Sequence, residues 1–221
     1  MATAKTDDSL RQVLFAAAAL KAPRIAQAAE RLATQAADAN WSRLDYLAAV
    51  LDREVAARAA SGTEIRIKTA GFPARKTLED FDFDQQSAAR GPITALASGA
   101  FLTEARNVVL LGPPGTGKTH LATALGVVAA RAGHRVAFDT ATGWVTRLTE
   151  AHRSDRLDAE LKRLRRYGLI IIDEVGYLPF EQDAANLFFQ LVAARYEHAS
   201  IVLTSNLPFS SWGDVFGDQA V

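Results

Sequence analysis

The sequence contains no cysteine among its 221 residues, which excludes a disulfide framework and any metal site built on thiolates. It has no excess of either charge, because 25 Lys and Arg residues balance 25 Asp and Glu residues. A neutral chain has no overall field that attracts nucleic acid or an anionic membrane, so any such binding must come from local patches. Long apolar runs are also missing, and the run at 15–20 is too short to span a bilayer.

The amino terminus has none of the features of a secretion signal. Asp7 and Asp8 stand where a signal peptide carries basic residues. We therefore expect a cytoplasmic protein that does not bind a membrane. A chain of this length holds one full-sized domain and a small additional one.

The most informative stretch runs from Gly112 to Thr119 and reads GPPGTGKT. The four residues before it, 108–111, are apolar as in a buried parallel strand, and residues 120–131 have leucines at helical spacing. A strand, a glycine-rich turn and a helix in this order predict a phosphate-binding P-loop. Backbone N–H groups and the helix N-terminus would hold the phosphates, with Lys118 reaching the β- and γ-phosphates and the Thr119 hydroxyl binding Mg²⁺.

The sequence therefore predicts ATP or ADP and Mg²⁺ as ligands. An aromatic pair upstream, Phe81 and Phe83, lies on one side of an extended segment. These rings either flank an adenine or close the edge of the domain, and the sequence favours neither. The predicted nucleotide contacts are Gly112, Pro113, Pro114, Gly115, Thr116, Gly117, Lys118, Thr119, His120 and Phe81.

A second motif, LIIIDE, places four large apolar residues directly before the carboxylates of Asp173 and Glu174. Ligands of open parallel sheets bind at the carboxyl ends of the strands. We expect Asp173 to hold Mg²⁺ together with Thr119, and Glu174 to polarise the attacking water. Asn206 ends a further apolar run, and we expect it to bind the γ-phosphate or that water. The predicted catalytic residues are thus Glu174, Lys118 and Asn206.

Residues 1–60 have the composition of two or three short helices. Pro23 starts or breaks one of them, and Ser42 with Asp45 three residues later predicts a cap for another. The leucines at helical spacing in that helix are Leu44, Leu47 and Leu51. This region is either a small bundle held by Leu and Ala contacts or a module that binds DNA or a partner, and its sequence favours neither.

A linker is expected over 61–77, because Ser61 and Gly62 end the helical composition and residues 64–68 alternate between charged and apolar. Its basic run is formed by Arg66, Lys68, Arg75 and Lys76. Two more helices are expected over 142–152 and 157–167, the second ending in basic residues. Basic residues there either complement the helix end or bind a phosphate backbone.

The motifs GPPGTGKTHLA, LIIIDEVGYLPF, DAANLFFQLVAARYE and TSNLPFSSWGDVFGD together resemble the IstB family of AAA+ ATPases. The segment AGFPARKTLEDFDF is similar to the interdomain segment of the same family. The resemblance implies an AAA+ fold of the initiator branch, with a three-layer α/β/α ATPase domain over 78–221 that lacks its C-terminal segment. Its parallel sheet would have five strands, with the P-loop strand central and the fourth strand between the first and third.

The resemblance also implies what such a protein does. IstB proteins assemble on duplex DNA as ATP-dependent homo-oligomers and deliver the target to an IstA-type transposase. An extra helical element after the second strand contacts nucleic acid in this branch, and it maps to about 142–167 here. The DNA contacts implied there are Arg147, Arg153, Lys162, Arg163 and Arg166.

Two other functions remain open at this point, a DnaC-type helicase loader and a nucleotide-binding scaffold without catalysis. Family members carry an arginine finger and a sensor arginine in a segment that has no counterpart up to Val221. We therefore expect nucleotide binding with slow hydrolysis, since such a finger contributes about 10³–10⁵ in rate in related GTPases. Arg195 is the nearby candidate for a substitute, and we expect it to be structural or at a subunit interface.

Overall fold

The computed structural model describes residues 2–85, 87–177 and 179–217, and it divides into two compact units, Met1–Glu64 and Ile65–Val221. The last four residues of the ATPase domain predicted over 78–221 lie outside the described residues. We refer to the two units as the helical unit and the α/β unit. No helix in the described ranges is long and apolar enough to cross a membrane.

The helical unit consists of α1 (Ala2–Ala19), α2 (Pro23–Asp38) and the first part of α3 (Arg43–Thr69). Pro23 occupies the first turn of α2, where the missing N–H costs nothing. The Ser42 hydroxyl accepts the N–H of Asp45 at 3.1 Å, and the Asp45 carboxylate accepts the N–H of Ser42 at 3.1 Å. This reciprocal pair is a capping box, as the sequence predicts.

The core of the helical unit is small. One cluster consists of Ala28, Leu32 and Val50, with Ile25, Tyr46 and Ala49 packed against it, and the other buried apolar side chains described in this unit are alanines: Ala17, Ala22 and Ala29. The leucines predicted at helical spacing are not part of it, since Leu44 is 76% exposed and Leu47 49%. The opposite side of α3 faces α2, where the Tyr46 hydroxyl donates to the carbonyl of Ala29 at 3.0 Å.

The linker predicted over 61–77 is wrong in its first half, because α3 continues through Ser61 and Gly62 to Thr69. Long-range contacts decide the conformation here. Ile67 and Ala70 are buried in a core cluster of the α/β unit, and the Arg66 guanidinium donates to the carbonyl of Ala130 at 2.8 Å. The residues that alternate in the sequence thus lie in a helix, where Ile67 packs on this core and Ile65 is 61% exposed.

The described residues of the α/β unit form one parallel sheet of four strands in the order β1-β4-β3-β2. These are β1 (Val108–Leu111), β2 (Val136–Thr140), β3 (Leu169–Val175) and β4 (Ser200–Ser205). The fourth strand lies between the first and third, as expected. The expected fifth strand is not found in the described ranges, so β1 is an edge strand of this sheet instead of a central one.

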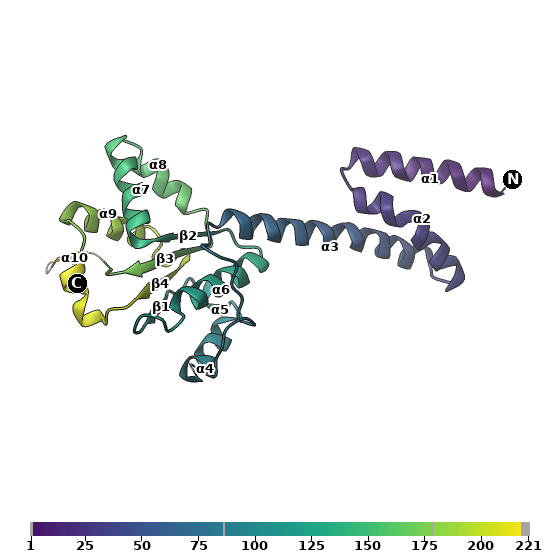
Figure 1. Ribbon diagram of the computed structural model, residues 1–221. Helices are drawn as coiled ribbons and strands as arrows, with labels where there is room; N and C mark the ends of the chain where they lie inside the picture. The colour runs from purple at the N-terminus through teal and green to yellow at the C-terminus, as the bar shows by residue number, and fades with distance from the viewer. Residues whose placement is uncertain (1, 86, 178, 218–221) are drawn as a thin grey trace. The chain divides into compact units, whose positions relative to one another are not determined.

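Helices cover both faces of the sheet (Figure 1). They are α4 (Ser87–Leu96), α5 (Ala100–Thr103), α6 (Lys118–Arg131), α7 (Ala141–Arg153), α8 (Leu157–Leu164), α9 (Gln182–Ala193) and α10 (Trp212–Phe216), with a 3₁₀ turn at Phe209–Ser211. Alternate residues of β3 face opposite layers: Ile170 and Ile172 pack in the cluster of α7 and α9, and Leu169 and Ile171 in that of α6. The result is the expected three-layer α/β/α arrangement.

Candidate nucleotide-binding site

The predicted P-loop joins the end of β1 to the start of α6. Gly115 and Gly117 have φ angles of 80° and 83°, a region that side chains with a Cβ rarely adopt. A Cβ built on Gly117 would also lie 2.5 Å from Cε2 of Phe81. Both the backbone and the close ring therefore require glycine at this position, and the loop leads directly into the N-terminus of α6.

Lys118 is half-buried at the first turn of α6 and bends back over the loop. Its ammonium donates to the carbonyls of Gly112 and Pro113 at 2.7 and 2.8 Å. Burial lowers the pKa of the Lys118 ammonium below its usual value, and the charge of Asp173 opposes that effect. The positive charge of Lys118 thus lies between the glycine-rich loop and the acidic end of β3.

Asp173 is buried at the carboxyl end of β3 and accepts two hydroxyl groups at one oxygen. Its Oδ1 accepts from Thr119 of α6 at 3.1 Å and from Thr204 of β4 at 2.5 Å. The structure therefore brings together the two residues predicted to hold Mg²⁺. A carboxylate and a hydroxyl are the hard oxygen ligands that Mg²⁺ prefers, so this pair fits the ion.

Glu174 follows Asp173 and points a different way. Its side chain is exposed, and its φ of 60° is in the left-handed region. The register between β3 and β4 shifts here, since Ile172 pairs with Leu203 but Val175 pairs with Ser205. This β-bulge inserts an extra residue in β3 and turns the Glu174 side chain out of the sheet.

Asn206 is exposed and comes directly after β4. The backbone links this strand end to the P-loop, because the N–H of Gly112 donates to the carbonyl of Ser205 at 3.3 Å. Asn206 thus lies at the same edge of the sheet as Lys118, Asp173 and the P-loop. Its direct role in binding phosphate or water stays a prediction.

Phe81 lies against the P-loop. Its ring meets the rings of His120 and Phe83 edge to face, at centroid distances of 5.2 and 4.8 Å. His120 Nε2 is 2.8 Å from the carbonyl of Thr77, which ties the segment before Phe81 to α6. The hydroxyl of Thr77 donates to Asp80 and lowers the pKa of that carboxyl. The structure thus places Phe81 beside the loop, and the contact with adenine stays a prediction.

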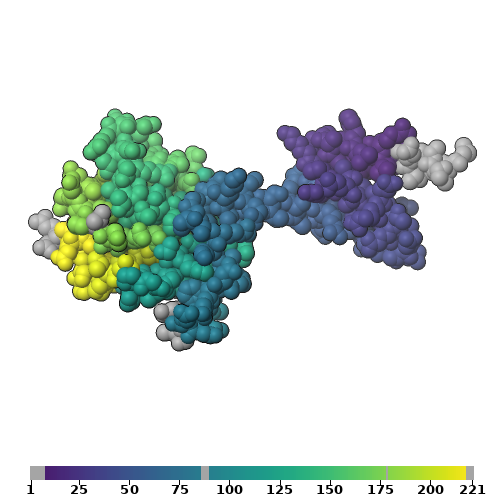
Figure 2. Space-filling view, in the orientation of Figure 1, coloured from purple at the N-terminus to yellow at the C-terminus, as the bar shows by residue number. Residues whose placement is uncertain are grey.

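The basic residues predicted to bind DNA fall into two groups. Arg66 bonds the end of α6, while Arg147 and Arg163 both pair with Glu160 at 2.5 and 2.7 Å. Arg163 is exposed all the same, as are the six other candidates, Lys68, Arg75, Lys76, Arg153, Lys162 and Arg166. Helices α7 and α8, which carry four of the nine candidates, lie at the surface of the α/β unit (green in Figures 1 and 2), and Arg166 follows the end of α8.

Arg195 is structural, as the sequence analysis allows. Its side chain is buried and donates to the carbonyls of Leu164, Tyr167 and Ser200 at 2.9 to 3.1 Å. Burial lowers the pKa of this guanidinium to about 10, so it is charged at neutral pH. A side chain held by three carbonyls inside its own subunit is not available to a nucleotide.

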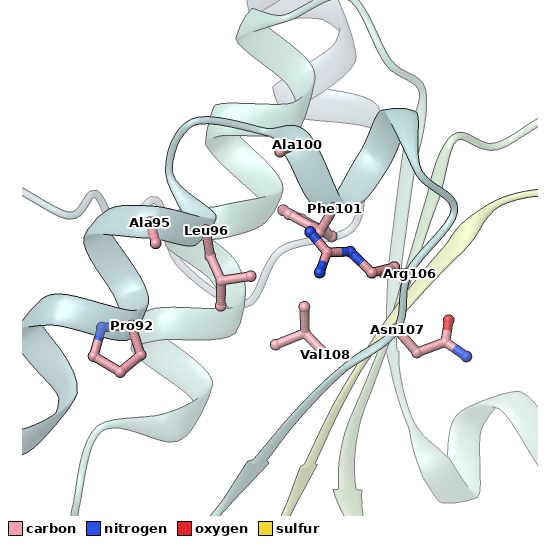
Figure 3. A pocket seen from close by; sticks show the side chains of 8 residues that line it. All are labelled: Pro92, Ala95, Leu96, Ala100, Phe101, Arg106, Asn107 and Val108. Carbon is pink, nitrogen blue, oxygen red and sulfur yellow. The ribbon is translucent and has the colours of Figure 1, made fainter.

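A separate pocket of about 340 Å³ lies at the amino end of β1, away from the P-loop (Figure 3). Its lining is mainly apolar and consists of Pro92, Ala95, Leu96, Ala100, Phe101, Arg106, Asn107 and Val108. It contains none of the predicted site residues. The Asn107 side chain accepts the N–H of Ile201 at 2.9 Å and so connects β1 to β4 at this end.

Sequence reasoning missed Thr204, although it contacts both predicted acidic positions. Its hydroxyl donates to Asp173 and accepts the N–H of Glu174 at 2.9 Å. The sequence offers one weak signal, a threonine in an otherwise apolar run. Its partner is 31 residues away, and only the strand order brings the two together.

Known proteins with similar sequences come from insertion elements. The chain is 44% identical over 203 residues to a protein of Pseudomonas aeruginosa described as an ATP-binding protein of insertion sequence IS21, covering 91% of this chain and 77% of that protein. It is 36% identical over 203 residues to the corresponding protein of IS5376 from Geobacillus stearothermophilus, covering 91% of this chain and 81% of that protein.

Solved structures share the fold at lower identity. DnaA from Aquifex aeolicus bound to AMPPCP matches with a TM-score of 0.59 at 22% identity, covering 68% of this chain and 48% of that chain. The DnaC helicase loader matches with a TM-score of 0.52 at 21% identity, covering 70% and 91%. These likenesses show that the α/β unit has the fold of the DnaA and DnaC ATPase domains.

The model of one protein family, IstB-like ATP binding protein, matches residues 15–221, which include the P-loop, Asp173, Glu174 and Asn206. The match extends over both units and over most of the chain. With the P-loop geometry and the insertion-sequence relatives, it establishes that this chain belongs to the IstB-like ATP-binding protein family.

Proposed function

We propose that this protein is a Mg²⁺-dependent ATPase that assembles on duplex DNA and helps a transposase select its target. The observation that carries the proposal is the meeting of the P-loop with Asp173 through the Thr119 hydroxyl at 3.1 Å. The insertion-sequence relatives supply the context of transposition. ATP binding is the property that the family's description states. Hydrolysis, assembly on DNA and the link to a transposase are our proposal.

The residues at the carboxyl edge of the sheet have complementary roles toward Mg²⁺-ATP. The backbone N–H groups of the P-loop and the N-terminus of α6 hold phosphate oxygens, and Lys118 leaves the carbonyls of Gly112 and Pro113 to pair with them. Thr119 and Asp173 hold the Mg²⁺, which neutralises charge on the phosphates when it is bound. Phe81 packs against the base.

Hydrolysis is assigned to the two exposed polar residues at that edge. Glu174 accepts the proton of the attacking water, and Asn206 orients that water or the γ-phosphate. We expect the rate to be slow, because Arg195 is held by three carbonyls and cannot supply positive charge to the phosphates. Assembly of several subunits side by side is the step that we propose ATP binding promotes.

DNA binding is assigned to two exposed basic residues, Lys162 in the last turn of α8 and Arg166 just after that helix. Arg163 lies between them but is paired with Glu160 through both guanidinium contacts, at 2.7 and 2.8 Å. A neutral chain holds DNA weakly as a monomer, and subunits in a row would align these residues into one basic track. Such contacts go to phosphates and carry no sequence preference.

A gel-shift titration with ATP at several salt concentrations tests this assignment. Replacing Lys162 and Arg166 by alanine should flatten log K against log salt by about two units per subunit, since each lost phosphate contact removes about 0.9. The matched control replaces Arg106 and Arg131, which are exposed elsewhere on the α/β unit, and it should keep the parent slope. An unchanged slope in the first variant would place the DNA surface elsewhere.

The partner is tested by copurification. The proposal predicts that the protein is retained with an IstA-type transposase on duplex DNA when ATP is present. A helicase loader, the alternative from sequence, would instead be retained by a replicative helicase. Retention by the helicase and not by the transposase would replace transposition by helicase loading as the function.

A further inference from the structure

Thr204 lies inside the sheet at a point where one hydroxyl meets two consecutive acidic residues. It is 2% exposed, near the carboxyl end of β4. Its hydroxyl donates to Oδ1 of Asp173 at 2.5 Å and accepts the backbone N–H of Glu174 at 2.9 Å. A hydroxyl has one hydrogen and two lone pairs, so it can make both bonds at once.

The β-bulge explains why a side chain is needed at this place. Between the pairs Ile172 with Leu203 and Val175 with Ser205, two residues of β3 lie opposite Thr204 alone. A bulge interrupts the ladder and leaves backbone groups without their usual partner. The Thr204 hydroxyl supplies that partner for Glu174, whose φ of 60° is costly for a residue with a Cβ.

The same hydroxyl acts on the carboxylate beside it. Oδ1 of Asp173 accepts Thr204 from β4 and Thr119 from α6, so the carboxylate is held between the two. If the Thr204 hydroxyl were removed, Oδ1 would keep the hydrogen bond from Thr119 and lose the other of these two bonds. The orientation of Asp173 toward the P-loop helix thus depends on a residue of the neighbouring strand.

We propose that Thr204 is a positioning residue for Mg²⁺-ATP. Its hydroxyl aims the Asp173 carboxylate at the Mg²⁺ position beside Thr119, and it fixes the backbone turn that points the Glu174 side chain out of the sheet. This inference rests on the proposed function, because it needs the site to bind Mg²⁺-ATP. Because Thr204 is 2% exposed, we assign it to holding Asp173 and the Glu174 backbone and not to touching the nucleotide.

Two substitutions separate the hydroxyl from the shape of the side chain. Thr204→Val keeps the shape and removes the hydroxyl, whereas Thr204→Ser keeps the hydroxyl. The readout is the Mg²⁺ concentration that gives half-maximal tightening of a fluorescent ATP analogue, which does not depend on hydrolysis. We expect Thr204→Val to raise that concentration about 10–100-fold, as for other groups that hold a metal ligand, and Thr204→Ser to stay near the parent.

A second buried hydroxyl of β4 provides the control. Ser200 is fully buried at the other end of the strand and donates to the carbonyl of Phe101 at 2.8 Å. Ser200→Ala should lower the melting temperature without moving the Mg²⁺ dependence. Thr204→Val should also leave binding of the analogue without Mg²⁺ unchanged, because the P-loop holds the phosphates.

Each other result has a definite meaning. If Thr204→Val has the parent Mg²⁺ dependence, or if Thr204→Ser shifts it as much as valine does, the hydroxyl does not position the site. If Thr204→Val and Thr204→Ala both fail to fold, the residue is structural and the proposal is wrong. If the parent protein binds the analogue equally with and without Mg²⁺, the proposed function itself fails first.

Discussion

The two units of this protein treat their apolar side chains differently. In the α/β unit, β3 buries Leu169, Ile170, Ile171 and Ile172 completely, with a helical layer on each face. In the helical unit, the buried apolar side chains are mostly alanines, and Leu44 is exposed on the same helix that buries Val50. A site with fixed polar groups needs rigid neighbours, and the α/β unit supplies them.

The two units also differ in how far the local sequence determines which side chains meet. Helical spacing is enough to form α3, but it does not decide which of two apolar faces is covered. In the sheet, the strand order decides the neighbours of every residue, and so it brings Asp173, Thr204 and Thr119 to one edge. We therefore expect all ATP chemistry to depend on the α/β unit, while changes in the helical unit leave it intact.

The largest expected effect is on hydrolysis. Glu174→Gln should reduce phosphate release by about 10²–10⁴-fold, because the amide no longer accepts a proton from water. ATP binding by calorimetry should remain at the parent level. Glu30→Gln in the helical unit is the matched control and should change neither. Equal phosphate release from Glu174→Gln and the parent would remove this residue from the mechanism.

The next effect is on binding. Lys118→Ala should weaken ATP affinity by about 2–5 kcal/mol, since it removes a partly buried charge that pairs with phosphate. Calorimetry or displacement of a fluorescent analogue measures the change. The exposed Lys21→Ala in the helical unit removes the same charge and should keep the parent affinity. Unchanged affinity in Lys118→Ala would overturn the P-loop assignment.

The third effect is on stability and compares one substitution in two places. Leu125 is completely buried in α6, and Leu125→Ala should cost the α/β unit about 2–5 kcal/mol through lost packing and a cavity. Leu44→Ala should change stability by less than about 0.5 kcal/mol, as for most exposed positions. Hydrogen exchange of β3 amides reports the α/β unit, and that of α3 amides within 43–64 reports the helical unit. A large loss of stability in Leu44→Ala would show that the face of α3 that carries Leu44 is covered in solution.

The smallest effect is on one helix end. Ser42→Ala breaks the capping box with Asp45 and should destabilise the start of α3 by about 1 kcal/mol. Exchange of the first-turn amides should speed up, while the affinity for ATP stays unchanged. A loss of ATP binding in this variant would contradict the independence of the two units.

Local motifs were predictable because their structure depends on near neighbours. The P-loop is a strand end, a turn and a helix start within a few residues, and its glycines have the positive φ that the motif requires. LIIIDE is likewise a buried strand with acids at its end. Such segments carry their own conformational preferences, so the sequence alone specifies them.

Features that depend on distant residues could not be predicted. Gly62 lies inside α3 because Ile67, Ala70 and Arg66 find partners in the α/β unit, which outweighs the cost of about 1 kcal/mol of a helical glycine. The sequence predicts that Arg147 binds DNA, but its guanidinium is paired with Glu160, which lies 13 residues away in the chain. The β-bulge at Glu174 follows from the register between strands, and no local pattern encodes it.

The left-handed backbone of Glu174 has a consequence for how this chain evolves. A residue with a Cβ in that conformation costs about 1–3 kcal/mol, whereas asparagine tolerates it better. Selection for folding alone would therefore favour Glu174→Asn, which keeps the turn and loses the acid. Under the proposed function, glutamate at position 174 keeps the acid that hydrolysis needs at a cost in folding stability, and a descendant that no longer hydrolyses ATP would gain stability from this change.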